Sequence, residues 1–280
     1  MGTLAEMLST PLGVIEWFVY LLAAVMFVIG LHLMNSPKTA RKGSAIGMVF
    51  AVAMAFIVLF AGEASNGFKH GVAVIVLIVG IVIGAVAGVV SAKKVKMTDM
   101  PQLVSVFNTV GGGAAALVAL NDILTSAETP SIVVLITAGL GIMIGSVTFS
   151  GSLIPAGKLQ GIQWVKKLSM PGKGFWNILF VVLTIVSFVM LCVQPNQRLL
   201  WSILTTVFAL CYGLVFVIPI GGADMPVVIS VLNACTGTAV AMSGLAINNI
   251  ALIVAGALVG AAGVTLSIAM SKAMNRPLLS

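Results

Sequence analysis

Long apolar runs separated by short polar breaks make up nearly the whole of the 280-residue chain. Turn-forming residues such as Pro37, Pro130 and Pro195 stand between neighbouring runs. Because a helix of about 20 apolar residues crosses a bilayer core of roughly 30 Å, the pattern predicts an all-α membrane protein, a bundle of nine transmembrane helices. The expected spans are residues 13–34, 43–62, 71–91, 101–121, 131–151, 174–193, 199–218, 226–244 and 250–270.

Two of these runs carry the same polar pattern. Asp-Met-Pro opens the fourth span and again the eighth, and Ser, Asn and Gly then follow at identical steps. The matched pairs are Asp99 and Asp224, Pro101 and Pro226, Ser105 and Ser230, Asn108 and Asn233, and Gly112 and Gly237. In a helix of 3.6 residues per turn, these steps place Ser, Asn and Gly on one face, turned toward other helices or a water-lined cavity.

The similarity continues into the following spans, where residues 147–150 (VTFS) match residues 264–267 (VTLS). The two copies begin an even number of spans apart, so the pattern predicts a parallel internal repeat of spans 4–5 and 8–9. Such duplication is typical of transporters. Duplication of a helical hairpin for packing alone is the alternative.

Composition indicates a membrane protein, and the distribution of charge predicts its orientation. Hydrophobic residues make up 60% of the chain and charged residues 8%, which excludes an ordinary soluble domain. Apart from Lys69 and Arg198, the basic residues follow spans one, three, five and nine, so the positive-inside rule predicts an outer N-terminus and a cytoplasmic C-terminus. The net charge of +7 is thus a topology signal, and no basic stripe interleaved with aromatics suggests nucleic-acid binding.

Hydroxyls and amides supply the polar groups expected in mid-membrane. The candidate site residues are Ser105, Asn108, Ser146, Thr148, Ser152, Ser230 and Asn233. These side chains bind water but do not titrate near neutral pH, and several hydroxyls are expected to bond to their own helix. The three cysteines lie inside apolar runs and are expected to be free thiols.

The Asp-Met-Pro corners have two interpretations. Asp99 and Asp224 could each cap a helix N-terminus. Alternatively, Asp224, whose own loop holds no basic residue, could pair with Lys272 or Arg276 to form a gate.

Four strings carry a family resemblance: residues 97–101 (MTDMP), 145–152 (GSVTFSGS), 221–228 (GGADMPVV) and 272–276 (KAMNR). They resemble the β-subunit of proton-translocating nicotinamide nucleotide transhydrogenase, and the likeness covers spans three to nine. The resemblance implies that residues 1–280 form a single transmembrane proton-translocating domain. It also implies an enzyme that couples proton movement to hydride transfer between NAD(H) and NADP(H), both bound on soluble domains.

The resemblance carries over onto five residues of the proton pathway and its coupling gate: Asn233, Ser152, Asp224, Lys272 and Arg276. Many family members have a histidine thought to relay protons where this chain has Asn108. A soluble NADP(H)-binding domain is expected after residue 280 and is absent, so this chain alone is expected to bind no nucleotide and to transfer no hydride.

The implied partners are a transhydrogenase α-subunit with membrane helices and an NAD-binding domain, the missing NADP-binding domain, and lipid. The complete complex is expected to be a dimer in the bacterial inner membrane. Because Asn108 cannot store a proton, we expect an α-subunit helix to present a histidine beside it, with Gly111 to Gly113 permitting close approach. The alternative function is a secondary transporter or channel for a small solute or ion.

Overall fold

The computed structural model describes residues 11–34, 36, 38–61, 71–126, 129–168 and 172–275, and every regular element in these ranges is a helix. The chain divides into two compact units, residues 1–94 and 95–280. The first unit contains α2 (Pro11–Leu33), α3 (Ala40–Ala61) and α4 (Gly71–Lys94). α2 and α3 pack against each other, and a side chain on Gly43 would come within 3.0 Å of Leu33.

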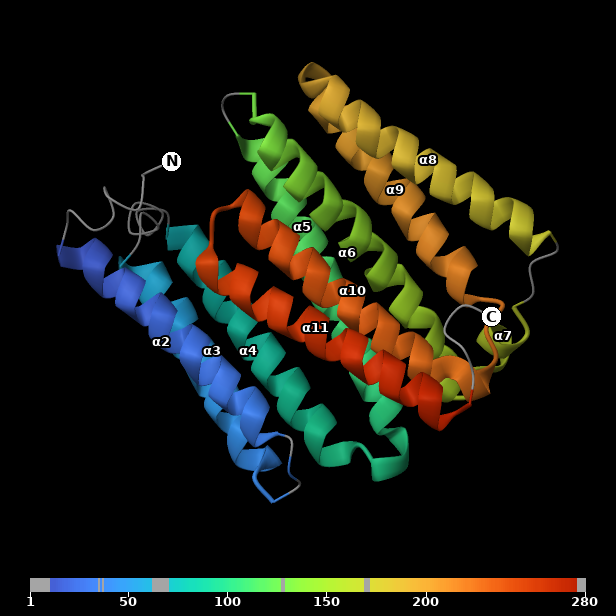
Figure 1. Ribbon diagram of the computed structural model, residues 1–280, viewed down its shortest axis with the longest axis horizontal. Coiled ribbons are helices and arrows are strands. Elements are labelled where there is room, and N and C mark those ends of the chain that lie inside the picture. Colours follow the sequence, from blue (N-terminus) through green and yellow to red (C-terminus); the bar gives the residue numbers. More distant parts are fainter. Residues whose placement is uncertain are drawn as a thin grey trace. The chain divides into compact units, whose positions relative to one another are not determined.

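The second unit is a helical bundle built around one helix, α6. Its helices are α5 (Met100–Thr125), α6 (Ile132–Leu159), α7 (Gln163–Lys166), α8 (Lys173–Val193), α9 (Arg198–Val217), α10 (Met225–Ala246) and α11 (Ile250–Ala273). Short 3₁₀ turns precede α5, α9 and α10: η2 (Met97–Asp99), η3 (Pro195–Gln197) and η4 (Gly222–Asp224). α6 contacts α5, α8, α9 and α10, while α11 lies along α10 (Figure 1).

The predicted all-α class is confirmed for the described residues. Six helices there, α5, α6 and α8 to α11, are long and apolar enough to cross a membrane. The first unit adds helices of 23, 22 and 24 residues at the positions of the first three expected spans. That nine helices cross the bilayer, and that residues 1–280 form one domain, remain predictions.

One helix runs past its predicted end. α6 continues through Pro155 to Leu159 instead of ending at residue 151. Residues 154–157 of the extension are buried, and a side chain on Gly157 would come within 3.1 Å of Val165 on α7. Packing against α7 stabilises this additional stretch of helix. α7 has only four residues, too few for a periodic pattern in the sequence to predict it.

Hydrogen bonds between distant segments group the helix ends of the second unit. At one end, Gln102 Nε2 donates to the Leu159 carbonyl at 3.2 Å and Lys158 Nζ donates to the Ile220 carbonyl at 2.8 Å. At the other end, Arg198 donates to the Ser126 carbonyl at 2.6 Å. Loops expected on one side of the membrane therefore lie at one end of the bundle; which end is cytoplasmic remains a prediction.

We expect a cysteine at Asn196 to be labelled by a membrane-impermeant maleimide from outside the cell, and a cysteine at Thr98 only after permeabilisation. Both side chains are exposed, so access to the correct side of the membrane decides the result. The measurement is labelling of intact against permeabilised cells. Labelling of the Thr98 variant in intact cells would contradict the predicted orientation.

Glycines bring α10 and α11 into backbone contact. A Cβ on Gly256 would lie 2.7 Å from the Gly237 carbonyl oxygen, and one on Gly237 would lie 2.7 Å from the Gly260 Cα. A Cβ on Gly263 would lie 2.7 Å from the Ala234 backbone nitrogen. The contact thus extends along the hairpin, as expected where small residues let membrane helices approach closely.

We expect Gly256→Leu to destabilise the protein by about 1–3 kcal/mol or more, because the added side chain must push α10 and α11 apart. Thermal unfolding in detergent measures the change. Gly174→Leu is the matched control, since a Cβ there meets nothing within 4 Å. Equal melting temperatures for the two variants would show that the α10–α11 contact tolerates separation.

Candidate functional site

The first copy of the repeat forms a buried polar contact between α5 and α6. Gly112 faces Gly145 across this interface, where a Cβ on Gly145 would lie 2.7 Å from the Gly112 carbonyl oxygen. The close approach lets Ser105 Oγ donate to the Ser152 carbonyl at 2.6 Å. Asn108 Nδ2 donates to Ser152 Oγ at 2.8 Å. Three of the predicted site residues are therefore brought together.

The Asn108 amide is only half satisfied. Its side chain is 6% exposed, and its Oδ1 is buried without a hydrogen-bond partner. Leaving a buried acceptor unpaired costs about 1–3 kcal/mol, so such an atom is normally found with a water or a partner group. Asn108 thus offers one buried acceptor for a water.

In the second copy of the repeat, the buried serines are hydrogen-bonded between α10 and α11. Ser230 Oγ donates to the Gly263 carbonyl at 3.3 Å, and Ser267 Oγ donates to Ser230 Oγ at 3.0 Å. Ser267 also bonds within its own helix. Buried unpaired side-chain atoms in the described residues occur on α5, α6 and α8, and none occurs on α10 or α11. The two copies share a sequence pattern but differ in hydrogen bonding.

Asn233 lies at the depth of Asn108. α5 packs on α10, and a Cβ on Gly111 would lie 3.3 Å from the Thr236 methyl group. Each asparagine precedes its member of this contact by three residues, which is about 4.5 Å along a helix axis. The repeat is therefore in register, and the half-buried Asn233 sits level with Asn108 on the neighbouring helix.

Two other predicted residues stand apart from this group. Thr148 is fully buried, but its hydroxyl donates to the Gly145 carbonyl of its own helix at 2.9 Å. Ser146 is buried with its Oγ unpaired. Six residues separate it from Ser152, which turns the two about 120° apart around α6, so Ser146 does not join the Asn108 contact.

The expected capping role of the two aspartates is wrong. Asp99 and Asp224 occupy the N-cap positions of α5 and α10, but neither side chain accepts a capping hydrogen bond. The backbone NH of each closes a 3₁₀ turn, with φ, ψ of −100°, 4° and −92°, −3°. Side-chain capping needs an extended N-cap residue. Lys272 is exposed and Arg276 lies outside the described residues, so the Asp224 gate stays a prediction.

The structure also reveals a cation that the sequence did not single out. Lys158 Nζ donates to the carbonyls of Ile218 and Ile220, which follow the last turn of α9. A cation at a helix C-terminus is stabilised by the unpaired carbonyls and the helix dipole. In the sequence, Lys158 was used only to predict the orientation in the membrane. Its place close after a long apolar run was the one signal that it also binds within the bundle.

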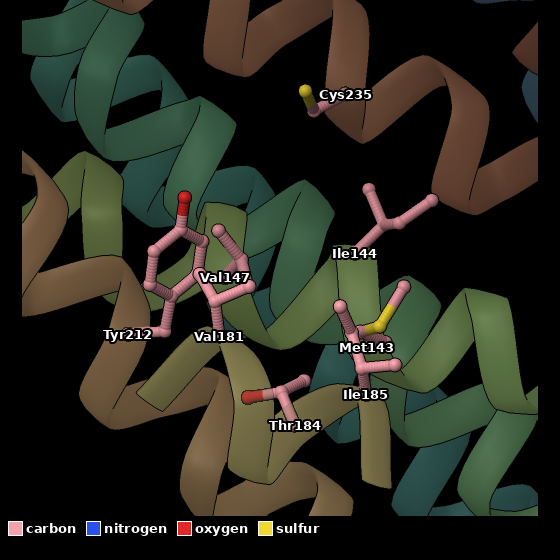
Figure 2. A pocket seen from close by; sticks show the side chains of 8 residues that line it. All are labelled: Met143, Ile144, Val147, Val181, Thr184, Ile185, Tyr212 and Cys235. Atoms are coloured by element: carbon pink, nitrogen blue, oxygen red, sulfur yellow. The ribbon is translucent and has the colours of Figure 1, made fainter. Parts of the chain in front are cut away.

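A separate cavity of about 270 Å³ lies between α6, α8, α9 and α10. Figure 2 shows its lining, Met143, Ile144, Val147, Val181, Thr184, Ile185, Tyr212 and Cys235. The Thr184 hydroxyl is bonded to the Phe180 carbonyl of its own helix. Apolar cavities of this kind stay dry, so this one does not extend the polar contact at Asn108.

In the described residues, the three cysteines are free and no group of His, Cys, Asp or Glu could hold a metal ion. The arrangement around Asn108 therefore offers water-binding amides and hydroxyls in a membrane-spanning bundle. It provides hydrogen-bond donors and acceptors along a helix interface, with no titratable group at the contact itself.

Comparison with known proteins places this bundle in a family. The family model described as NAD(P) transhydrogenase beta subunit matches residues 16–280. Over 268 residues the chain is 37% identical to NAD(P) transhydrogenase subunit beta of Rhodospirillum rubrum, and a strain of that species gives the same figures. The match covers 93% of this chain and 56% of the relative, so the chain spans about half the length of these proteins. The chain belongs to the NAD(P) transhydrogenase β-subunit family.

Proposed function

We propose that this chain is the membrane domain of a proton-pumping transhydrogenase. It conducts protons across the membrane, coupled to hydride transfer between NAD(H) and NADP(H) on soluble domains. Family membership and the apolar helices support a membrane domain, and the name subunit beta implies an α partner. The observation that carries the proposal is the buried Asn108, held by Ser152 with its Oδ1 left for a water.

In this proposal, Asn108 and Asn233 hold water at one depth of the membrane. The Nδ2 of Asn108 is committed to Ser152, which fixes the amide so that Oδ1 accepts. An amide accepts and donates hydrogen bonds but does not take up a proton near neutral pH. A separate titratable group must therefore hold the proton, and a histidine on an α-subunit helix fits this need.

The close approach expected at Gly111 to Gly113 is not available to that helix. Gly111, Gly112 and Gly113 do not form an open face, because they lie against Thr236, against Gly145 with Thr148, and against Phe149. They serve packing within the unit. The exposed apolar side of α5, at Phe107, Val110 and Leu117, is turned roughly 100–180° away from Asn108 around the helix, so a partner helix packed there would not place its histidine beside the amide.

Coupling to the nucleotides is proposed to pass through Asp224, Lys272 and Arg276 at the predicted cytoplasmic end. When bound to their own domains, the nucleotides supply hydride transfer. Every regular element in the described residues is a helix, so these residues contain no strand–glycine turn–helix unit of the kind that cradles a dinucleotide. The residues of this chain position water and, at this end, respond to the NADP(H)-binding domain.

The test uses the complete complex in proteoliposomes, with nicotinamide absorbance reporting hydride transfer and an entrapped dye reporting pH. We expect hydride transfer to move protons and an imposed pH gradient to change its rate. Hydride transfer with no proton movement would overturn the proposal. A membrane domain that moved a solute without any nucleotide would favour the transporter alternative.

A further inference from the structure

A second cavity lies at the predicted outer end of α5. Its volume is about 400 Å³. Its lining residues are Leu117, Val118, Asn121, Asp122, Thr125 and Ile247. Unlike the cavity near Tyr212, it contains a carboxylate, an amide and a hydroxyl within five residues of one helix, so its chemistry suits water.

Asp122 brings an unpaired charge to this cavity. Its Oδ2 is buried and has no hydrogen-bond partner. The Ser126 hydroxyl donates to the backbone carbonyl of Asp122 at 2.6 Å and so does not pair with Oδ2. A buried carboxylate oxygen without a partner is costly, so it either binds water in the adjoining cavity or takes up a proton.

Asp122 also lies in line with Asn108. Fourteen residues separate them, which is about 21 Å along α5 and only about 40° around it. Both therefore lie along the side of α5 that meets α10. The α5–α10 seam is defined here as Asn108, Gly111, Ala115 and Asp122 on α5, with Asn233, Thr236 and Ser243 on α10 and Ile247 directly after it.

Contacts along this seam tie the two helices together. The Gly111–Thr236 contact lies nearest the asparagines. Ser243 Oγ donates to the Ala115 carbonyl at 3.0 Å, farther toward the outer end. Asp122 and Ile247 then share the cavity at the end itself. The seam thus runs from the two asparagines to the cavity that contains Asp122.

The surroundings of Asp122 contain one other charge in the described part of the second unit. The adjacent ends of α6 and α10 carry no titratable side chain. α9 contributes Arg198, whose guanidinium donates to the Ser126 carbonyl. A carboxylate in a polar cavity, with a cation bound to the backbone one helical turn farther on, is suited to gaining and losing a proton.

We propose that Asp122 exchanges protons with water at the predicted outer end of the path, through the cavity that it lines. This inference rests on the proposed proton conduction and adds its outer terminus. Water in the cavity delivers a proton to the Asp122 carboxylate or accepts one from its carboxyl form. Passage onward follows the α5–α10 seam toward Asn108 and Asn233.

The test compares Asp122→Asn and Asp122→Glu in the complete complex, with proton-coupled hydride transfer measured against the pH on the outer side. A positioned acid–base group contributes about 10²–10⁴-fold. We therefore expect Asp122→Asn to slow coupled turnover at least about tenfold, most strongly at high outer pH, where protons are scarce. Asp122→Glu should keep most of the rate and displace the pH of half-maximal rate.

Asp99→Asn is the matched control, because it makes the same change at the other end of the same helix, at an exposed residue. It should leave the outer pH profile unchanged. A wild-type profile in Asp122→Asn overturns the role of Asp122 while wild-type pumping still stands. Equal losses of coupled turnover in the Asp122→Asn and Asp122→Glu variants of an assembled complex would show that the shape of the side chain matters and not its proton exchange. That result would also overturn the role of Asp122. Absence of pumping in the wild-type complex would instead defeat the proposed function itself.

Discussion

Asn108→Leu is expected to lower proton-coupled turnover of the complete complex at least about tenfold, because leaving a buried polar group without its hydrogen-bond partner costs about 1–3 kcal/mol. Leucine has nearly the shape of asparagine but supplies neither the donor to Ser152 Oγ nor the free Oδ1. Water at this depth would lose its fixed acceptor. The measurement is hydride transfer with and without an ionophore in proteoliposomes, alongside the amount of assembled complex.

Thr109→Val provides the control on the same helix. Thr109 is buried, but its hydroxyl only returns to the Ser105 carbonyl at 3.0 Å. Removing it should leave coupled turnover near the wild-type rate. Coupled pumping by Asn108→Leu at the rate of Thr109→Val would remove Asn108 from the path.

Asn233→Leu is expected to reduce coupled turnover at least about tenfold while the complex still assembles, because water that loses a buried hydrogen-bond partner loses about 1–3 kcal/mol. Asn233 is half-buried at the depth of Asn108, so a branched apolar side chain there would displace water between α5 and α10. Leucine is at least as favourable as asparagine in a helix, which protects the fold. The same vesicle assay, with the amount of complex quantified, measures the effect.

Thr238→Val is the corresponding control on α10, because the exposed Thr238 bonds only to the Ala234 carbonyl of its own helix. It should behave as wild type. If Asn233→Leu pumped normally, the conducting water would follow α5 and α6 alone. The prediction thus distinguishes a path shared by both copies of the repeat from one confined to the first.

The sequence predicted the helices because run length and polarity are local properties. The steps from Ser105 to Asn108 and Gly112 likewise predicted a shared buried face, since helical periodicity relates residues one or two turns apart. Ser152 was named as a polar candidate, but its pairing with Ser105 and Asn108 was not predicted. The register of α6 against α5 is set by the contact between Gly112 and Gly145, and these two residues lie far apart in the sequence.

Local chemistry misled where the backbone departed from a regular helix start. Aspartate before an α-helix is a good capping signal. The 3₁₀ turns before α5 and α10 remove the extended geometry that capping needs, and no residue pattern distinguished the two cases. The sequence also could not predict the unpaired oxygens of Asn108 and Asp122. Whether an atom lacks a hydrogen-bond partner depends on neighbours that only the packed structure identifies.

Hydroxyls illustrate the same limit from the other side. The expectation that several would bond to their own helix is confirmed at Thr109, Thr148 and Thr236. Side-chain chemistry alone gives that tendency. It does not tell which hydroxyl, such as that of Ser105, crosses to the neighbouring helix instead.

The meshed glycines of α10 and α11 have a mechanical consequence. Because the two backbones touch near Ala234, Gly237 and Gly256, neither helix can slide without breaking contacts along the whole hairpin. We expect the pair to behave as a stiff lever. A displacement of the α11 end that carries Lys272 would then move Asn233 by a similar distance, because the two helices bend little in between.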